Sequence, residues 1–272
     1  MAFTRRLAIL PGGLGGLGSS IGRKLRSEGA LLAILYAPFE AARRDVLLSS
    51  GYNNDRTNIH TYECDITDPA SVQSAFSSLQ RDHAPTGTGA FPSILINTAG
   101  YVSLSDMHLT PPEETLKHLT TNVLGPMLCS QAFANLYFSA SASRTKNENG
   151  NGSAPPGRIV TLASQAAHVA LHRHGAYCAS KSAVLGLTRC MASEWGPKGI
   201  TANSVSPTVA WTDLGKKAWG EQGVKEKLLQ SIPTGKAALP GEVADAVVFL
   251  CQDSSGMING ADIRVDGGYT IR

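Results

Sequence analysis

A tyrosine and a lysine stand four residues apart in the segment Tyr177-Cys178-Ala179-Ser180-Lys181. At the start of a predicted helix, this spacing places the two side chains on one face. An ammonium about 4 Å from a phenolate, at an effective dielectric constant of about 20, gains about 4 kcal/mol, which corresponds to roughly three pK units. We therefore predict that Lys181 lowers the pKa of Tyr177 from its usual value of about 10 toward neutrality, where a phenol can act as an acid or a base.

A serine lies close to this pair in the expected fold. Ser164 follows the apolar run Arg158–Leu162, which predicts a strand, and ligands bind beyond the ends of strands in parallel sheets. An ordinary Tyr/Lys pair on an exposed helix surface is the alternative, because such pairs are common. The position of Ser164 favours a catalytic group made of Ser164, Tyr177 and Lys181.

A glycine-rich turn follows the first predicted strand, with the sequence Pro11-Gly12-Gly13-Leu14-Gly15-Gly16-Leu17-Gly18. Glycines let the backbone turn tightly and approach a pyrophosphate, whose charge is met by free N–H groups and the positive end of the next helix. A plain connecting loop is the alternative, but the position after the first strand favours nucleotide binding. A triphosphate-binding loop is disfavoured because Ser19 stands where the phosphate-binding lysine would be needed.

Short apolar runs alternate with longer amphipathic segments along the chain. We predict strands at Leu7–Leu10, Leu31–Leu35, Ile59–Tyr62, Ile94–Ile96, Arg158–Leu162, Thr201–Val205 and Ile263–Val265, and helices at Ser19–Glu28, Ala70–Leu79, Leu116–Phe138, Tyr177–Trp195 and Glu242–Cys251. This alternation predicts an α/β fold: a doubly wound parallel sheet of about seven strands with helices on both faces. We expect one domain over residues 1–272, with a flexible surface loop at about 139–157, where Ser, Asn, Gly and Pro predominate.

Composition excludes several classes of protein. The net charge of +3 is small and its cations are scattered, which argues against a nucleic-acid partner. Five widely spaced cysteines without a CxxC pair argue against a disulfide framework or a zinc site and favour a reducing compartment. No run approaches the roughly 20 apolar residues of a membrane-spanning helix. We expect a cytoplasmic protein with no membrane partner.

The chain resembles a classical short-chain dehydrogenase/reductase over nearly its whole length. The matching motifs are Gly16-Leu17-Gly18, Cys64-Asp65-Ile66, Asn97-Thr98-Ala99-Gly100, Asn122-Val123-Leu124-Gly125, Ser164 with Tyr177 and Lys181, Ser206-Pro207-Thr208 and Val265-Asp266-Gly267-Gly268. The Pro-Thr pair in Ser206–Gly215 and the Lys216-Lys217-Ala218-Trp219 that follows are similar to the polyol dehydrogenase and L-xylulose reductase branch. The resemblance implies a Rossmann-type fold and an oxidoreductase that uses NAD(H) or NADP(H).

The same resemblance assigns residue roles. It implies that Ser164 holds the substrate oxygen, that Tyr177 exchanges its proton, that Lys181 acidifies Tyr177 and binds the nicotinamide ribose, and that Asn122 supports a water relay. Asp65 and Ile66 should meet the adenine, Asn97, Ala99 and Gly100 the ribose and phosphates, and Thr212 the carboxamide. The expected cofactor contacts are Gly12, Gly16, Leu17, Gly18, Tyr36, Asp65, Ile66, Asn97, Ala99, Gly100, Tyr177, Lys181, Pro207, Thr208, Ala210 and Thr212.

Three positions depart from the family pattern. Pro11 stands where a threonine is usual, and Thr98 replaces the second Asn of the usual Asn-Asn-Ala-Gly. Tyr36 ends the second predicted strand, where an acidic residue would bind the ribose hydroxyls of NAD and repel the extra phosphate of NADP. Cofactor preference therefore stays open: Arg43 or Arg44 could reach a 2′-phosphate, although arginines on a helix surface are more often simply solvated.

Substrate contacts are expected from Ser164, Gln165, His174, Tyr177 and Trp211. His174 resembles a pocket histidine of xylulose reductases, and Trp211 and Trp219 could form a wall of the same pocket or pack elsewhere. His168, His172 and His174 lie close in sequence, but without a fourth ligand they more often line a wet pocket or surface. We predict no metal.

The leading hypothesis is interconversion of a small polyol and its ketose. The alternatives are a reductase of a larger ketone in secondary metabolism and a catalytically silent NAD(P)-binding sensor, because fold alone does not establish turnover. The resemblance also implies a homo-oligomer, tetramer or dimer, in which the helices Leu116–Phe138 and Tyr177–Trp195 pair between subunits.

Overall fold

The computed structural model describes residues 1–83, 89–145, 154–212 and 222–271. Within these ranges seven strands form one sheet, and every neighbouring pair is parallel. The order across the sheet is β3-β2-β1-β4-β5-β6-β7. The strands are β1 (Arg6–Pro11), β2 (Leu31–Tyr36), β3 (Ile59–Glu63), β4 (Phe91–Asn97), β5 (Gly157–Leu162), β6 (Ile200–Pro207) and β7 (Asp262–Val265).

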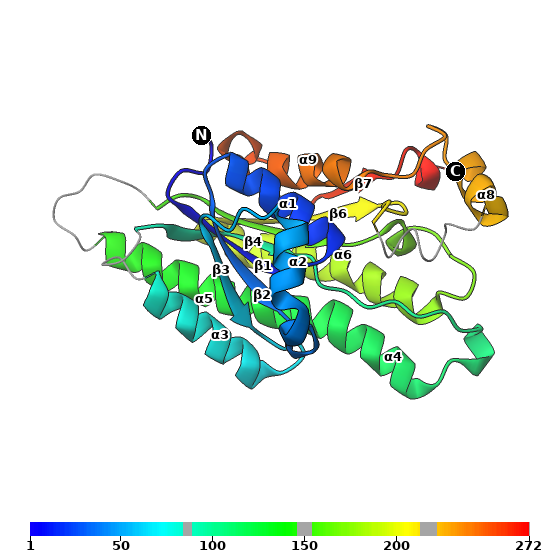
Figure 1. Ribbon diagram of the computed structural model, residues 1–272, viewed down its shortest axis with the longest axis horizontal. Helices are drawn as coiled ribbons and strands as arrows, with labels where there is room; N and C mark the ends of the chain where they lie inside the picture. Colours follow the sequence, from blue (N-terminus) through cyan, green and yellow to red (C-terminus); the bar gives the residue numbers. More distant parts are fainter. Residues whose placement is uncertain (84–88, 146–153, 213–221, 272) are drawn as a thin grey trace.

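Helices cover both faces of the sheet (Figure 1). One face carries α1 (Gly16–Ser27) and α9 (Pro240–Cys251), and the other carries α3 (Pro69–Asp82), α5 (Gly125–Thr145) and α6 (Gly175–Trp195). The remaining α-helices in the described ranges are α2 (Arg44–Gly51), α4 (Pro112–Leu119) and α8 (Gln222–Ser231), and a π-helical turn, η3 (Thr120–Leu124), joins α4 to α5.

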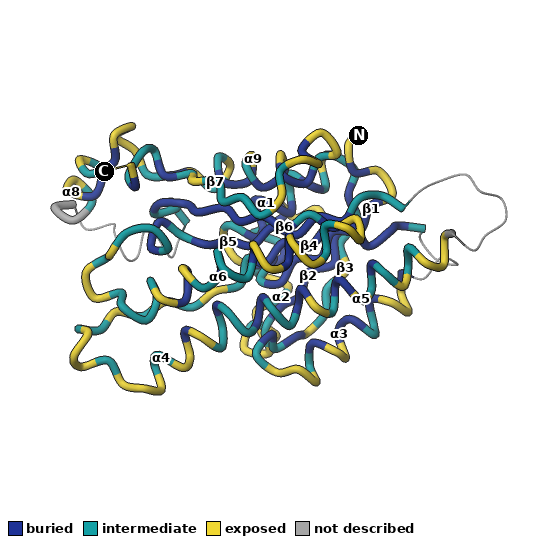
Figure 2. The backbone as a smooth tube through the Cα atoms, turned by 180° about the vertical axis from the view of Figure 1, so that it is seen from behind, coloured by how far each residue is buried: buried dark blue, intermediate teal, exposed yellow. Residues whose placement is uncertain are grey.

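The five central strands, β1, β2, β4, β5 and β6, are buried on both sides, since successive residues point to opposite faces and helices cover each face, whereas the edge strands β3 and β7 are only partly buried. Ala8 and Leu10 of β1 join the core beneath α1 and α9, whereas Leu7 and Ile9 join the core beneath α3 and α5. Figure 2 shows the buried backbone concentrated along the sheet, with exposed residues on the outer sides of the helices. The uninterrupted apolar runs in the sequence are explained by this two-sided packing.

Strand order reverses between β1 and β4, because the chain proceeds outward from β1 to β3 and then returns to place β4 on the other side of β1. Loops leaving the carboxyl ends of β1 and β4 therefore diverge, and open α/β sheets bind their ligands in the crevice beyond such an edge. The glycine-rich turn follows β1, and the predicted catalytic serine follows β5, two strands away. The topology thus brings both motifs to one edge.

The predicted sheet and its two helical faces are confirmed, but two element boundaries were wrong. The helix predicted over Leu116–Phe138 is α4 and α5 joined by the π-turn at Thr120–Leu124. The loop predicted at 139–157 begins too early, since residues 139–145 continue α5 and 157 begins β5. Ser and Ala in that stretch tolerate helical geometry, and Tyr137 anchors the preceding turn in the core. Residues 146–153 lie outside the described ranges.

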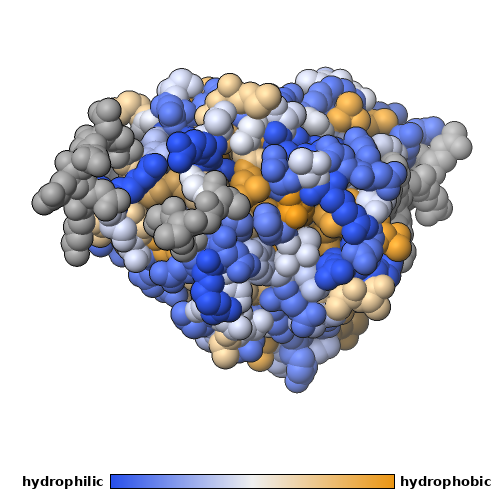
Figure 3. Space-filling model, turned by 60° about the vertical axis from the view of Figure 1, so that its left-hand side comes forward, coloured by the Kyte–Doolittle hydropathy of each residue, from blue (hydrophilic) through white to orange (hydrophobic). Residues whose placement is uncertain are grey.

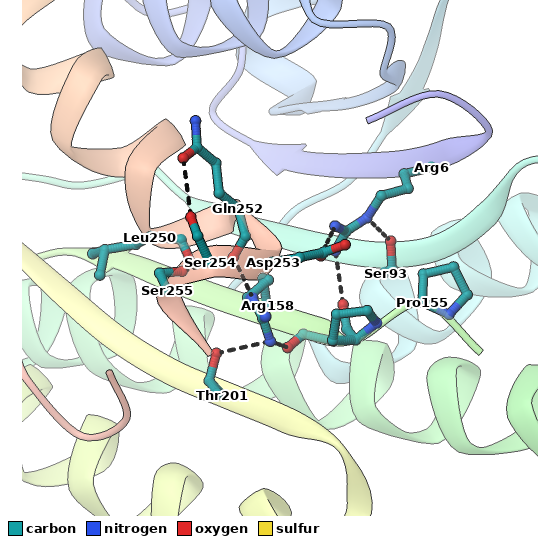
Figure 4. A network of polar contacts seen from close by, with 12 residues as sticks. Arg6, Ser93, Pro155, Arg158, Thr201, Leu250, Gln252, Asp253, Ser254 and Ser255 are labelled. Carbon is teal, nitrogen blue, oxygen red and sulfur yellow. Dashed lines mark hydrogen bonds and ion pairs between the residues drawn. The ribbon is translucent and has the colours of Figure 1, made fainter. Parts of the chain in front are cut away.

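Two buried arginines connect the opposite edge of the sheet to the end of α9 (Figure 4). Arg6 donates to Ser93 Oγ at 2.8 Å, to Asp253 Oδ1 at 2.9 Å and to the Pro156 carbonyl at 2.7 Å. Arg158, on β5, donates to the carbonyls of Gly157 and Gln252. Burial lowers the pKa of both guanidinium groups, so the hydrogen bonds must offset a cost of desolvation.

Removing Arg6 should therefore be strongly destabilising. We expect Arg6→Ala to lower the free energy of unfolding by about 3 kcal/mol, because the buried Ser93 on β4 and the Pro156 carbonyl just before β5 lose their donor and the buried side chain leaves a cavity. Urea unfolding measures this loss. The control is Arg81→Ala on the exposed surface of α3, where the change should stay below about 1 kcal/mol; equal losses in the two variants would disprove the assigned role of Arg6.

The outer surface is mostly hydrophilic on the face shown in Figure 3, with apolar residues confined to smaller areas between polar ones. Among the described helices, none has the length and apolar character required to span a membrane.

Candidate active site

The glycine-rich turn lies directly against the end of β4. Gly12 has a φ of +78°, and a Cβ added to it would lie 2.6 Å from the Ala99 nitrogen. The hydroxyl of Thr98 donates to the Pro11 carbonyl at 2.7 Å, and the amides of Thr98 and Ala99 donate to the same oxygen at 3.0 Å. The two departures from the family pattern, Pro11 and Thr98, therefore contact each other and fasten the turn to β4.

The first turn of α1 is open toward the crevice. Its N-cap, Gly15, offers no side-chain acceptor, and the first turn carries no acidic residue. Free N–H groups and the positive end of the helix therefore remain for an anion. A Cβ on Gly16 would lie 2.8 Å from the Thr212 side chain, so the predicted carboxamide contact lies beside the predicted phosphate contact.

The ends of β2, β3 and β4 carry the residues predicted to meet the adenosine half. Tyr36 ends β2 and is buried, and the Arg44 guanidinium lies over its ring at 5.9 Å from the centroid. The Asp65 side chain bonds within its own loop: its Oδ1 accepts hydrogen bonds from the amide and the hydroxyl of Thr67. Ile66 packs against Gly125 at the start of α5.

Several buried polar atoms beside the crevice have no hydrogen-bond partner. They are the side-chain oxygens of Asn97 at the end of β4, Gln165 just after β5 and Thr208 just after β6. A buried oxygen without a donor costs free energy, so such atoms commonly mark where a ligand binds. Together with the crowded glycine turn and the uncapped helix, the oxygens of Asn97 and Thr208 fit a bound dinucleotide, and that of Gln165 leaves an acceptor for a second molecule beside it.

The predicted catalytic residues converge at this edge. Lys181 is 6% exposed, and its Nζ donates to the Leu162 carbonyl at 2.8 Å and lies 5.8 Å from the Tyr177 ring centroid. A Cβ on Gly100 would lie 3.7 Å from Lys181 Nζ and 3.5 Å from Asn122 Oδ1. Gly100, Asn122, Tyr177 and Lys181 thus lie close together at the edge where the glycine turn lies.

The prediction that Lys181 lowers the pKa of Tyr177 was wrong. Burial raises the pKa of Tyr177, and a hydrogen bond with the Ser164 side chain opposes this only in part. Burial also lowers the pKa of Lys181 to about 8. Both side chains lose water in the folded chain, and this desolvation, which the four-residue spacing does not reveal, opposes the charged form of each group.

Burial of Lys181 predicts how stability depends on pH. The pKa is about 8 in the folded chain against an ordinary value of 10.5, so between these values the unfolded chain holds a proton that the folded chain has released. The free energy of unfolding therefore rises with pH in this window, and this contribution is lost as pH falls through 8. We expect wild type to gain about 2 kcal/mol relative to Lys181→Met from about pH 8 to about pH 9.5. Urea unfolding at both pH values measures it; parallel pH responses of the two proteins would refute it.

Asn122 lies in the π-turn and is fully buried. Its Oδ1 accepts from the Tyr101 amide at 2.7 Å, and its Nδ2 donates to the Tyr101 carbonyl at 2.8 Å and to Ser180 Oγ at 2.9 Å. Ser180 Oγ in turn donates to the Tyr177 carbonyl at 2.8 Å. The widened turn thus joins the segment after β4 to the first turn of α6.

The histidines do not converge. His168 Nε2 lies 2.9 Å from Asp262 Oδ2 and 3.2 Å from Ser206 Oγ, facing β6 and β7. His174 is beside the site, with its ring centroid 6.1 Å from that of Tyr177. Trp211 packs against Lys225 of α8, and its amide donates to the Ala238 carbonyl. Trp219 lies outside the described residues.

Sequence reasoning missed two residues that border the site. Glu114 and His118 of α4 contact the segment that follows Gly100, and the His118 ring centroid lies 6.3 Å from that of Tyr177. The available signal was their spacing: Glu114, His118 and Asn122 are each four residues apart, which places polar groups on one helix face.

The fold and site define a class of protein: an α/β enzyme with a dinucleotide crevice, beside which a buried lysine lies next to a partly buried serine and tyrosine. A family model described as enoyl-(acyl carrier protein) reductase matches residues 12–270. The chain belongs to the short-chain dehydrogenase/reductase family. It is an NAD(P)-dependent oxidoreductase acting on CH–OH groups of a small molecule.

Two curated relatives and one solved structure illustrate the similarity. D-threitol dehydrogenase of Mycolicibacterium smegmatis is 37% identical over 98% of this chain and 94% of its own length. L-xylulose reductase of Caenorhabditis elegans is 30% identical over 98% of this chain and 97% of its own length. The structure of ElxO with NADP bound has a TM-score of 0.82 at 22% identity, covering 98% of this chain and 99% of its own. The resemblance to the polyol dehydrogenase and xylulose reductase branch is confirmed.

Proposed function

We propose that this enzyme interconverts a secondary alcohol of a small polyol and the corresponding ketose. The observation that carries the proposal is the convergence of Ser164, Tyr177, Lys181 and Asn122 beside the glycine turn. The relatives named for D-threitol and L-xylulose, which cover almost the whole chain, support a hydroxylated substrate of few carbons.

The cofactor would be held along the crevice by the predicted contacts on the glycine turn, on the ends of β2 to β4 and on the segment after β6. When bound, it supplies or accepts the hydride at C4 of its nicotinamide. Ser164 would hold the substrate oxygen, and the Tyr177 hydroxyl would give a proton to that oxygen in reduction or remove it in oxidation. Lys181 would bind the nicotinamide ribose, and Asn122 would support a water relay from Lys181 to solvent.

Polar groups beside Tyr177 suit a substrate with several hydroxyls. Gln165 is buried and its Oε1 lacks a partner. His174 Nδ1 lies 2.7 Å from the His172 carbonyl, which fixes that nitrogen as a donor and leaves Nε2 as an acceptor. Each of these groups can bind a hydroxyl on a carbon next to the reacting one, whereas an apolar ketone would leave them without partners.

A substrate panel tests this proposal. Purified enzyme should turn over tetritols, pentitols or the matching ketoses, and kcat/KM should fall at least about a hundredfold when a flanking hydroxyl is replaced by hydrogen. Larger apolar ketones serve as the comparison. Preference for those ketones would favour the alternative of a reductase in secondary metabolism, and binding of cofactor without any hydride transfer would favour the sensor.

The end of β2 favours NADP(H) over NAD(H). Tyr36 provides no carboxylate there, and Glu40 is turned back to accept from the Ala37 amide at 2.8 Å. Arg44 extends over the Tyr36 ring, where its guanidinium can meet a 2′-phosphate.

Separate titrations with NADPH and NADH measure this preference. We expect Arg44→Gln to weaken NADPH binding about tenfold or more, since a charge-assisted hydrogen bond contributes about 1.5–3 kcal/mol, and to change NADH binding less than about twofold. Arg43→Gln, an exposed neighbour, is the control. Tighter binding of NADH than of NADPH by wild type would reject the assignment.

We also propose a cytoplasmic homo-oligomer, tetramer or dimer, built on one domain over residues 1–272. All five cysteines are free, which suits a reducing compartment. Leu116 and Leu119 on α4 are 61% and 38% exposed beside the long helices α5 and α6, and a second subunit would cover them. Light scattering of the purified protein distinguishes monomer, dimer and tetramer.

A further inference from the structure

One face of α4 and η3 forms hydrogen bonds with residues 101–103, the segment that follows Gly100. Glu114 and His118 of α4 and Asn122 of η3 are spaced four residues apart, and all three side chains bond to residues 101–103. The family resemblance assigned a role to Asn122 alone. The other two residues extend its contacts by two helical turns toward the amino end of α4.

His118 is 1% exposed, and both its ring nitrogens are bonded. Its Nε2 accepts from the Ser103 amide at 3.1 Å, and its Nδ1 lies 2.7 Å from the Glu114 carbonyl. An amide can only donate and a carbonyl can only accept, so these partners fix the neutral tautomer with the proton on Nδ1. The imidazole is therefore held in one orientation.

Glu114 binds the side chains of the same segment. One carboxylate oxygen accepts from the Tyr101 hydroxyl at 2.9 Å and from Ser103 Oγ at 2.7 Å. These hydrogen bonds lower the pKa of Glu114, so the carboxylate is the form that binds them. The Lys117 ammonium lies over the Tyr101 ring at 4.2 Å from its centroid. Residues 101–103 are thus fixed through both backbone and side chains.

The held segment and the His118 ring form one wall around Tyr177. The His118 ring centroid is 4.9 Å from that of Tyr101 and 6.3 Å from that of Tyr177, where the rings meet at 68°. Because the Tyr177 ring turns about its bonds to the backbone, the direction of its hydroxyl depends on what packs against the ring.

We propose that Glu114 and His118 are positioning residues for Tyr177: they hold residues 101–103 as part of the site wall, and the packing of the His118 ring against the Tyr177 ring keeps the phenol aimed at the substrate oxygen. This inference rests on the proposed role of Tyr177 in proton transfer. It makes the Glu-x3-His-x3-Asn pattern of this chain a single functional unit.

Amide hydrogen exchange of the cofactor-free protein tests the contact without any substrate. In His118→Leu the Ser103 amide loses its acceptor, and we expect its exchange to be at least about tenfold faster than in wild type. His118→Gln keeps an acceptor oxygen near the position of Nε2, so its Ser103 amide should exchange at a rate between those of the other two proteins. Equal exchange in all three proteins would overturn the proposal.

Steady-state kinetics test the effect on Tyr177. We expect His118→Leu and Glu114→Ala to lower kcat about tenfold each, with KM and the dinucleotide Kd changed less than about threefold, because misorientation affects proton transfer more than binding. His118→Gln and Glu114→Gln, which each keep an acceptor, should recover part of the loss. Glu113→Ala, an exposed carboxylate one residue away, is the control and should match wild type.

Two results separate this inference from the proposed function. If Tyr177→Phe keeps full turnover, the proposed proton transfer fails, and positioning of Tyr177 fails with it. If Tyr177→Phe is inactive but Glu114→Ala and His118→Leu match Glu113→Ala in kcat per folded molecule, proton transfer stands and the positioning role is disproved. Thermal unfolding of each variant supplies the folded fraction.

Discussion

Replacing Tyr177 with phenylalanine is expected to lower kcat about a thousandfold, within the range that a positioned proton donor contributes. The substitution removes one oxygen and keeps the ring, so the packing against His118 and His174 should persist. The dinucleotide Kd should change less than about threefold. Stopped-flow or steady-state turnover with the best polyol of the panel, together with a cofactor titration, measures both quantities.

The pH dependence of wild type gives this prediction a second observable. Burial raises the pKa of Tyr177, so at neutral pH the phenol holds its proton, which suits reduction. Oxidation needs the phenolate, and its rate should therefore climb with pH over the alkaline range, whereas reduction should not. In Tyr177→Phe the remaining rate of oxidation should no longer rise with pH.

The matched control is Tyr62→Phe on β3, whose hydroxyl bonds to Asp82 far from the catalytic group. That variant should keep the turnover of wild type. Turnover by Tyr177→Phe within about tenfold of wild type would show that another group transfers the proton, and the proposed chemistry would have to be abandoned.

The centre of the sheet could be predicted because its five central strands are buried on both faces. Runs such as Leu31–Leu35 and Ile94–Ile96 are continuous in apolar residues; a glycine, Gly29, stands just before the first, and Ser93 and Asn97 flank the second. The glycine turn was equally clear, because five glycines lie within residues 12–18, directly after the first predicted strand. These features follow from local patterns that no tertiary contact has to supply.

The details of the site depend on contacts between distant segments, and here the sequence was insufficient. The π-turn around Asn122 has no local signal, because its extra residue serves a bond to Tyr101 and Ser180. The change in the pKa of Tyr177 was predicted in the wrong direction. The four-residue spacing shows that Lys181 is near Tyr177, but it does not show that both side chains lose water on folding. Glu114 and His118 were missed because their partners follow β4 and can be recognised only once the chain has folded.

Gly18→Ala is expected to weaken dinucleotide binding at least a hundredfold, a loss of about 2.7 kcal/mol. Gly18 lies in the first turn of α1, where helix propensity alone would predict that alanine stabilises the protein by up to about 1 kcal/mol. The atoms packed around Gly18 make alanine unfavourable instead. A Cβ there would lie 2.4 Å from the Gly12 carbonyl oxygen and 2.8 Å from Gly13 Cα, and backbone atoms cannot move aside without opening the turn that faces the pyrophosphate.

A second glycine in the first turn of a helix separates the effect of helix propensity from the effect of the steric clash at Gly18. A Cβ on Gly241, in α9, would meet nothing within 4 Å, so Gly241→Ala should bind NADPH as wild type does and unfold at the same or a slightly higher temperature. Fluorescence titration with NADPH and thermal unfolding compare the two variants directly. If Gly18→Ala binds the cofactor as tightly as Gly241→Ala, the dinucleotide phosphates do not lie at the glycine turn. A phosphate site formed by closely packed backbone has no room for the added methyl group, so the methyl group would have to weaken binding there.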